Sequence, residues 1–229
     1  MKTALLDCDH VLPQFQKDHG TYPEMFNNLF LEIDLVSHFV CDGDFPNVED
    51  YDAYVISGSK LSVYDDIPWI KELIEFTKSA HQSEKKILGV CFGHQMIAEA
   101  LGGKVEKSDA GFLIGVHEFE ILVQESWMVP YKSPFNMLML CQDQVLKLPS
   151  NSRILAKSGS CPIAIFEVGD KVLGIQGHPE FTKEYNKAVF ESRLGKIGQD
   201  KIDQAIASFA NEPDSRLLQR HLTAFLSRD

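Results

Sequence analysis

The chain has 229 residues, of which 44% are hydrophobic and 24% charged, which is the composition of an ordinary globular protein. Its formal net charge of −11 argues against a basic surface that holds nucleic acid or an anionic membrane. No apolar run approaches the about 18 residues that a membrane-spanning helix needs, and the first residues lack the apolar stretch of a secretory signal. We therefore expect small molecules or proteins as partners, with no nucleic acid and no membrane.

The first half of the chain alternates short apolar runs with amphipathic patterns, which predicts βαβ units and a mainly parallel sheet. Strands are predicted over residues 2–7, 33–40, 53–56 and 87–90. Thr21 and Glu24 have the spacing of a capping box and predict a helix through Leu31. A second helix is predicted to begin at Asp66 and Pro68, and its apolar residues recur at helical spacing.

A third helix is predicted from His94 to Leu101, ending at Gly102 and Gly103. The middle of the chain is then rich in strands, and we expect part of this region to be antiparallel. Strands are predicted over residues 112–123, 137–140, 153–157, 162–168 and 172–176.

From Thr182 to Ser227 the pattern is helical, with loop signals at Gly195, Gly198 and residues 211–213. No linker or repeat interrupts the chain. The prediction is one α/β domain over residues 1–229, with three layers, a partly antiparallel strand extension and C-terminal helices.

The five cysteines form no Cys-x-x-Cys pair, and their number is odd. This pattern disfavours a disulfide framework and a structural zinc site. It is typical of free thiols in a reducing compartment, so we expect a cytoplasmic protein.

Cys91 follows the predicted strand over residues 87–90 and precedes a predicted helix, with Gly89 and Gly93 two positions away on each side. This is the spacing of a nucleophile elbow, in which a sharp turn needs glycine where neighbouring chain comes close. A helix N-terminus favours a thiolate, and the N–H of Phe92 lies where an oxyanion would form. A buried structural cysteine is the alternative, which the two glycines disfavour.

His178 lies in the segment Gly177-His178-Pro179-Glu180, directly after the last predicted strand. Pro179 keeps this segment extended, so the side chains of His178 and Glu180 point to the same side. Glu180 can then orient an imidazole that serves as base for a cysteine. An ordinary surface turn explains this segment equally well in isolation, and the elbow makes catalysis the better hypothesis.

A third segment, residues 57–60, places small residues after a strand. Such a turn can present backbone N–H groups at the carboxyl edge of a sheet. An ordinary strand-end turn is the better interpretation of this segment alone. It lacks the spacing of a phosphate-binding loop, and no dinucleotide-binding fingerprint occurs in the chain.

Together, and in this order, the three segments resemble the class I, or triad-type, glutamine amidotransferase family. A fourth match is the segment from Cys141 to Val145. Two departures stand out: Ser59 and Lys60 replace the usual Gly-Pro after Gly58, and Cys141 replaces a usual histidine. The sequences around the elbow and around His178 are also similar to those of γ-glutamyl peptidases.

The resemblance implies a flavodoxin-like sheet, no metal and no other cofactor. It implies that Cys91 is the nucleophile, with His178 as base and Glu180 as the residue that orients it. Backbone N–H groups of Ser59 and Phe92 would form the oxyanion hole. The resemblance further assigns substrate binding to a group of residues near the turn: Gly58, Gln95, Gln142 and Asp143.

The implied function is a glutamine amidotransferase-like hydrolase that cleaves a γ-glutamyl amide bond through a cysteine thioester. Its substrate is glutamine, with ammonia passing to a separate synthase subunit, or a small γ-glutamyl peptide, with water as acceptor. Two other classes stay open. One is a catalytically idle binding module, and the other is a redox sensor in which Cys8 or Cys141 resolves an oxidised Cys91.

Overall fold

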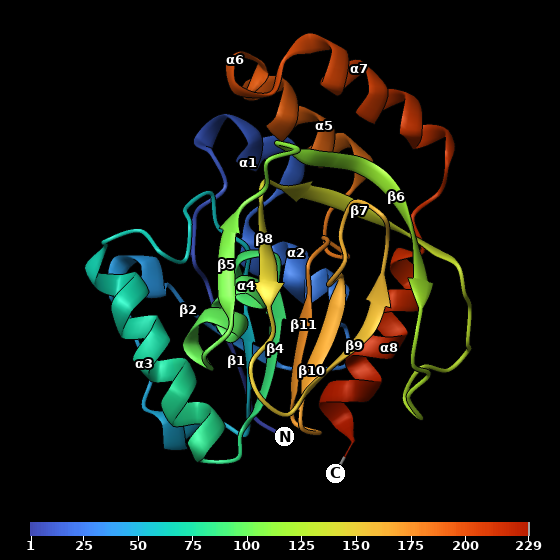
Figure 1. Ribbon diagram of the computed structural model, residues 1–229. Helices are drawn as coiled ribbons and strands as arrows, with labels where there is room; N and C mark the ends of the chain where they lie inside the picture. The colour runs from blue at the N-terminus through green and yellow to red at the C-terminus, as the bar shows by residue number, and fades with distance from the viewer. Residues whose placement is uncertain (229) are drawn as a thin grey trace.

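The computed structural model describes residues 1–228, in which nine strands form one mixed sheet (Figure 1). Across the sheet the strands lie in the order β2 (Leu35–His38), β1 (Thr3–Leu6), β3 (Ala53–Ile56), β4 (Lys86–Val90), β11 (Val172–Ile175), β10 (Ile165–Val168), β9 (Ser152–Lys157), β6 (Leu113–Ile121) and β7 (Phe135–Cys141). The strands from β2 to β11 are parallel, and the pairs from β11 to β7 are antiparallel. The predicted antiparallel extension is therefore present.

Helices α2, α3, α4 and α8 cover the two faces of the parallel strands. The α-helices of the described chain are α1 (Pro13–His19), α2 (Tyr22–Leu29), α3 (Pro68–Gln82), α4 (Phe92–Ala100), α5 (Lys183–Ser192), α6 (Leu194–Ile197), α7 (Gln199–Ala207) and α8 (Ser215–Ser227). Phe26 of α2 and Leu222 of α8 share one core cluster with Val90, whereas Leu73 of α3 and Met96 of α4 share another. The predicted three-layer arrangement is confirmed.

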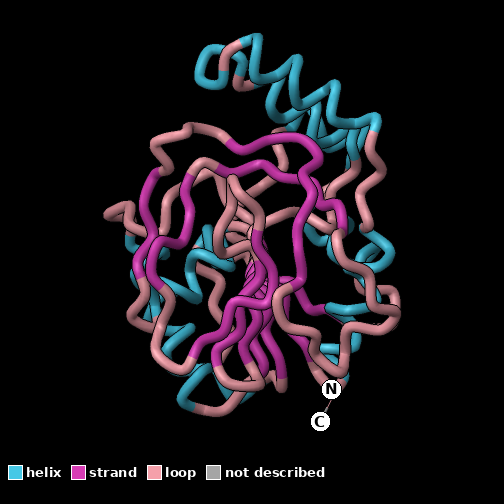
Figure 2. Tube along the Cα trace, turned by 45° about the vertical axis from the view of Figure 1, so that its right-hand side comes forward, coloured by secondary structure: helices cyan, strands magenta, loops and turns pink. Residues whose placement is uncertain are grey.

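The antiparallel strands carry a helical cover of their own. Phe190 of α5 and Ile202 of α7 pack with Val116 of β6 in a third core cluster. Figures 1 and 2 show α5, α6 and α7 above the curved strands β6 and β7. This cover closes one side of the space above the parallel strands.

Three features of the structure depart from the sequence-based expectations. Helix α1 was not expected, because none of its residues is buried and no amphipathic pattern marks it. A small antiparallel pair of β5 (Lys104–Lys107) and β8 (Asp143–Lys147) was also not expected. Gly195, read as a loop signal, lies inside α6. Short 3₁₀ turns complete the described elements: η1 (Val40–Asp42), η2 (Val48–Asp50) and η3 (Ser208–Ala210).

The parallel strands end at a common edge, so the segments that follow them lie side by side. Ser57 follows β3, Cys91 follows β4 and Gln176 follows β11. The register pairs Gly89 with Ile56 and Val90 with Ile175, so these strands end at the same level. Across residues 1–228, no helix combines the length and the apolar character that a membrane crossing requires.

Candidate active site

Cys91 occupies a strained turn between β4 and α4. Its φ of 53° and ψ of −100° lie where side chains other than glycine are rarely found. A Cβ atom on Gly89 would lie 2.3 Å from the Gly93 carbonyl carbon, and one on Gly93 would lie 2.2 Å from the Ile56 oxygen. Glycine is therefore required on both sides, as the elbow hypothesis predicted.

The imidazole of His178 is fixed in a buried position by its neighbours. Its Nδ1 atom lies 2.7 Å from Glu180 Oε1, and its ring stacks on Phe181 with centroids 4.1 Å apart. Its backbone N–H donates to the Leu138 carbonyl at 2.8 Å. Because a carboxylate only accepts hydrogen bonds, the proton sits on Nδ1 and Nε2 is left for the thiol or the substrate.

An electrostatic interaction also couples His178 to Cys91. Burial lowers the pKa of His178, but the negative charges of Cys91 and Glu180 outweigh burial and raise this pKa to about 10. The charged imidazolium form of His178 is therefore favoured. A Cβ atom on Gly58 would lie 3.2 Å from His178 Cε1 and 3.8 Å from Cys91 Cβ, so Gly58 also borders both side chains.

His94, the histidine nearest to Cys91 in sequence, is in a different environment. It is fully buried against Phe166, with ring centroids 4.8 Å apart. Burial lowers the pKa of His94 to about 3, so its imidazole is neutral at physiological pH. The core position makes His94 a packing residue rather than a second candidate base.

The turn after β3 offers backbone donors near the thiol. Within the described chain, the N–H groups of Ser59 and Phe92 donate to no acceptor. Lys60 is held by Asp9, with Nζ 2.7 Å from Oδ1 and the backbone N–H donating to Oδ2 at 3.1 Å. The departure at Ser59 and Lys60 thus keeps the backbone donors while adding an ion pair. The oxyanion hole itself remains a prediction.

A cavity of about 940 Å³ opens above Cys91. Of the predicted site residues, its lining includes Ser59, Cys91, Gln95, Gln142 and Asp143. His178 and Glu180 are buried beside the thiol and do not line the cavity, and neither do Gly58 and Phe92.

Gln95 makes its hydrogen bonds within the protein. Its Nε2 atom donates to the Asp143 carbonyl at 2.8 Å and to Gln176 Oε1 at 3.2 Å. The Asp143 carboxylate accepts from Ser62 Oγ at 2.5 Å. Gln95 therefore fixes the start of β8 at the cavity wall, and its contact with substrate stays a prediction.

Several cavity residues were not found by the sequence analysis. Lys107, Arg193 and Lys196 line the cavity, and among residues 1–228 none of the three forms an ion pair. Arg193 follows α5 and Lys196 lies in α6, far along the chain from the elbow. No motif or spacing marks them, so only the three-dimensional structure brings them to the site.

Three of the other cysteines are buried thiols with a raised pKa. Burial raises the pKa of Cys8 and Cys141 well above the ordinary value and that of Cys161 to about 12. Cys141 lines the cavity together with Cys91, whereas Cys8 does not. Protonated, buried thiols are poor nucleophiles, which disfavours Cys8, Cys141 and Cys161 as the nucleophile.

Comparison with known proteins places this geometry in a family. Residues 22–195 match the family described as glutamine amidotransferase class-I. The chain belongs to this family. The prediction of a class I glutamine amidotransferase-like hydrolase is thereby confirmed.

Relatives of this amidotransferase-family chain include γ-glutamyl peptidase 4 of Arabidopsis thaliana, 33% identical over 93% of this chain and 90% of the relative. γ-Glutamyl peptidase 3 of the same plant is 34% identical over 97% and 94%. A glutamine-hydrolysing GMP synthase of Aeropyrum pernix is 32% identical over 63% of this chain but only 27% of its own length.

Among solved structures, a glutamine amidotransferase from Thermotoga maritima has a TM-score of 0.79, with 20% identity and complete coverage of both chains. This likeness shows the fold, and it agrees with the predicted flavodoxin-like sheet.

Proposed function

We propose that this chain is a self-sufficient γ-glutamyl peptidase, in which Cys91 is the nucleophile, His178 the proton carrier and Glu180 the residue that orients and charges His178. The observation that carries this proposal is the strained thiol at a helix N-terminus beside a buried His178–Glu180 pair, with Nδ1 and Oε1 2.7 Å apart.

The mechanism has two halves. The Cys91 thiolate attacks the γ-carbonyl carbon, and the negative oxygen that forms accepts hydrogen bonds from the N–H groups of Ser59 and Phe92. The imidazolium of His178 gives its Nε2 proton to the leaving amine as the C–N bond breaks. Neutral His178 then takes a proton from water, and the resulting hydroxide attacks the thioester carbonyl. The C–S bond breaks, which releases glutamate and regenerates the thiolate.

The glutamyl part of the substrate is proposed to lie against the elbow. Gly58, Gln95 and the backbone of residues 142–143 are the proposed binding groups. Gln95 would act mainly through the segment it holds, because its Nε2 already donates to the Asp143 carbonyl and to Gln176. Gly58 leaves room beside His178 that a side chain would fill.

Three features support a peptide rather than glutamine as the substrate. The cavity of about 940 Å³ exceeds the needs of one amino acid. Unpaired Lys107, Arg193 and Lys196 line it in a chain of net charge −11, so they favour a carboxylate on the departing part of the substrate. Two relatives matched over nine tenths or more of their length are named γ-glutamyl peptidases.

The second candidate is hydrolysis of glutamine with transfer of ammonia to a separate synthase subunit. The partial match to a GMP synthase favours it, since that enzyme carries a similar segment within a longer chain. We retain it as the alternative to the peptidase, together with the proposals that the whole chain acts as one domain and works in the cytoplasm.

The test compares three substrates on the isolated, reduced chain: a γ-glutamyl dipeptide, the same dipeptide with its C-terminal carboxylate amidated, and glutamine. Released glutamate is measured to obtain kcat/KM for each. We expect the free-carboxylate dipeptide to exceed glutamine by tenfold or more, which is about 1.4 kcal/mol in transition-state free energy. The amidated dipeptide should fall between the two.

Cys91→Ser serves as the matched control and should abolish turnover of all three substrates while its unfolding temperature stays close to that of the unchanged chain. Negligible turnover by the unchanged chain that a synthase subunit restores would favour the second candidate. Equal turnover of the two dipeptides would remove the proposed carboxylate contact but leave the peptidase in place.

A further inference from the structure

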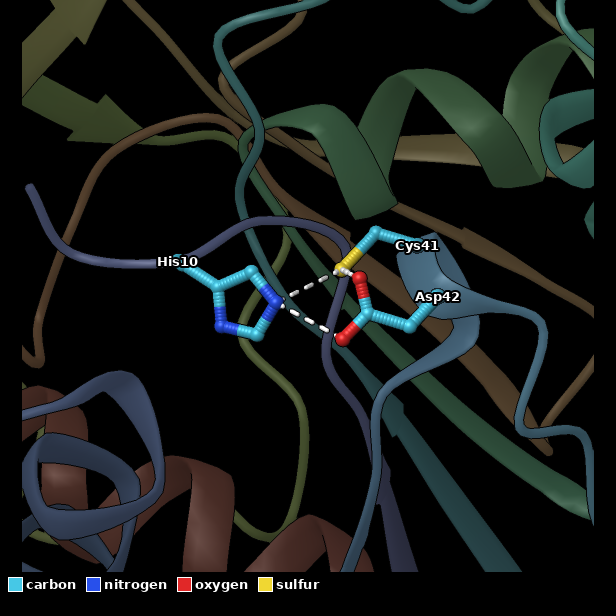
Figure 3. Close-up of side chains that lie close together, drawn as sticks. All are labelled: His10, Cys41 and Asp42. Atoms are coloured by element: carbon cyan, nitrogen blue, oxygen red, sulfur yellow. Dashed lines mark hydrogen bonds and ion pairs between the residues drawn. The ribbon is translucent and has the colours of Figure 1, made fainter.

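A second cluster of reactive side chains lies at the same edge of the sheet, one and two strands away from β3. His10 follows β1, and Cys41 and Asp42 lie in η1, which follows β2. Figure 3 shows the three side chains pointing toward one another from these two separate segments. The catalytic hypothesis uses none of them.

The donor atoms are spaced like the ligands of one metal ion. His10 Nε2 lies 3.7 Å from Cys41 Sγ and 2.9 Å from Asp42 Oδ2, and Cys41 Sγ lies 3.9 Å from Asp42 Oδ1. A tetrahedral zinc ion with bonds of about 2.0 Å to N or O and about 2.3 Å to S separates its ligands by about 3.3–3.6 Å. One ligand atom from each residue lies within 4.8 Å of the other two, and the side chains of His10 and Asp42 are exposed and free to adjust.

The backbone and one aromatic ring hold the cluster in place. The His10 ring stacks on Phe39 with centroids 4.9 Å apart. The Cys41 N–H donates to the Asp7 carbonyl at 3.3 Å, which ties η1 to the end of β1. Gly43, with φ of 88°, closes the turn by donating to the Val40 carbonyl at 3.1 Å. The two segments therefore present their ligands from a fixed frame.

The surroundings of the cluster favour a cation. The carboxylates of Asp42, Asp9 and Asp7 act electrostatically on Cys41. These carboxylates attract a divalent ion, and the charge of a bound ion stabilises a thiolate ligand.

We propose that His10, Cys41 and Asp42 bind one divalent ion of the zinc class at the mouth of the catalytic cavity. One nitrogen, one sulfur and one oxygen ligand suit a borderline ion such as Zn²⁺ better than Mg²⁺ or Ca²⁺, which prefer oxygen. Three protein ligands leave one coordination position for water or an anionic group. Because His10 lines the cavity, the ion lies at its edge.

The spacing rules for zinc motifs miss this site. The absence of a Cys-x-x-Cys pair disfavours a structural zinc site, and the family resemblance implies no metal in the chemistry. His10 and Cys41 are 31 residues apart along the chain, so the proposed ligands form no motif. The site is thus an addition beside the thiol chemistry and not a part of it.

The experiment uses the full chain with Cys91→Ser, which removes the catalytic thiol as a competing zinc ligand. The reduced, chelator-treated protein is titrated with Zn²⁺ by calorimetry and with Co²⁺ by absorbance. We expect one ion per chain, with the intense visible bands of tetrahedral Co²⁺ and a near-ultraviolet thiolate-to-cobalt band. Adding Cys41→Ser should abolish the thiolate band and weaken Zn²⁺ binding by about 100-fold.

The matched controls remove a thiol and an imidazole elsewhere, in the same Cys91→Ser background. Cys161→Ser and His81→Ala should leave both titrations unchanged, whereas His10→Ala should weaken Zn²⁺ binding as Cys41→Ser does. Absence of the tetrahedral Co²⁺ spectrum would overturn the proposal, and so would Zn²⁺ affinity that Cys41→Ser leaves unaltered. Either result leaves the γ-glutamyl hydrolase proposal intact, because that chemistry uses none of these ligands.

Discussion

The parallel and antiparallel regions of the sheet contribute different parts of the candidate site. The parallel strands β3, β4 and β11 lead into the proposed reactive groups. Cys91 directly follows β4, and Ser59 and His178 lie three residues after the ends of β3 and β11. The antiparallel region and its helical cover contribute walls instead, among them Gln142 after β7 and Arg193 after α5.

The difference separates chemistry from recognition. The atoms proposed to make and break bonds follow buried strands, where backbone hydrogen bonds and packing fix their positions. The groups proposed to bind the rest of the substrate lie on helix ends and loops, where substitutions cost less stability. Changes in the first region should therefore lower kcat, and changes in the second should raise KM.

The largest expected effect comes from the parallel region. His178→Ala removes the proton carrier, so activity should fall by several powers of ten. Glu180→Gln keeps an acceptor for Nδ1 but loses the charge, so measurable activity should remain. The check is kcat for both variants with a γ-glutamyl dipeptide. If His178→Ala kept activity, another base would have to replace it.

Gly93→Ala tests whether the elbow needs the close approach of backbone. The added Cβ would lie 2.2 Å from the Ile56 oxygen, a backbone atom that cannot move aside, so we expect a loss of several kcal/mol in unfolding free energy. Gly159→Ala is the control, because a Cβ there meets nothing within 4 Å. Denaturant unfolding of both variants measures the difference, and equal stabilities would refute the packing argument.

A substitution in the wall should affect recognition alone. Arg193→Ala removes an unpaired cation, so KM for a dipeptide with a free carboxylate should rise about tenfold with kcat nearly unchanged. KM for the amidated dipeptide should hardly move. Arg220→Ala, on α8 and outside the cavity, is the control. If Arg193→Ala lowered kcat as much as Glu180→Gln does, the proposed separation of recognition from chemistry would be wrong.

The smallest expected effect is a shift in pH dependence. The negative neighbours of His178 raise its pKa to about 10, so the imidazolium needed by the leaving amine is lost as pH rises through that range. Glu180→Gln removes one negative neighbour and lowers the pKa of His178. The alkaline limb of kcat/KM should therefore move to lower pH. If the alkaline limb of kcat/KM did not move, Glu180 would orient His178 without raising its pKa.

The sequence predicted the parallel region well because its signals are local. The strand over residues 53–56 matches β3, and the capping box of Thr21 and Glu24 is present at the start of α2. The elbow could be predicted because Gly89, Cys91 and Gly93 form a recognisable pattern within five residues. The close contact that requires glycine at position 93 comes from Ile56 of β3, which the pattern does not show.

The features that the sequence did not predict depend on contacts between distant segments. Strand β5 has one buried residue, Val105, so no alternation marks it. Arg193 and Lys196 reach the cavity only because α5 and α6 lie over β6 and β7. His10 and Cys41 meet because β1 and β2 are neighbours in the sheet. These contacts depend on the topology of the sheet, which cannot be predicted from a short stretch of sequence.

The central claim is that Cys91 attacks the γ-carbonyl of a γ-glutamyl substrate. A glutamine-shaped chloroketone, followed by peptide mapping, tests this claim most directly, because the label reports which thiol meets a γ-glutamyl group. We predict that Cys91 is alkylated before the other four cysteines, and that excess γ-glutamyl dipeptide slows the labelling. Labelling of Cys41 or Cys161 first, or labelling that the dipeptide does not slow, would contradict the account.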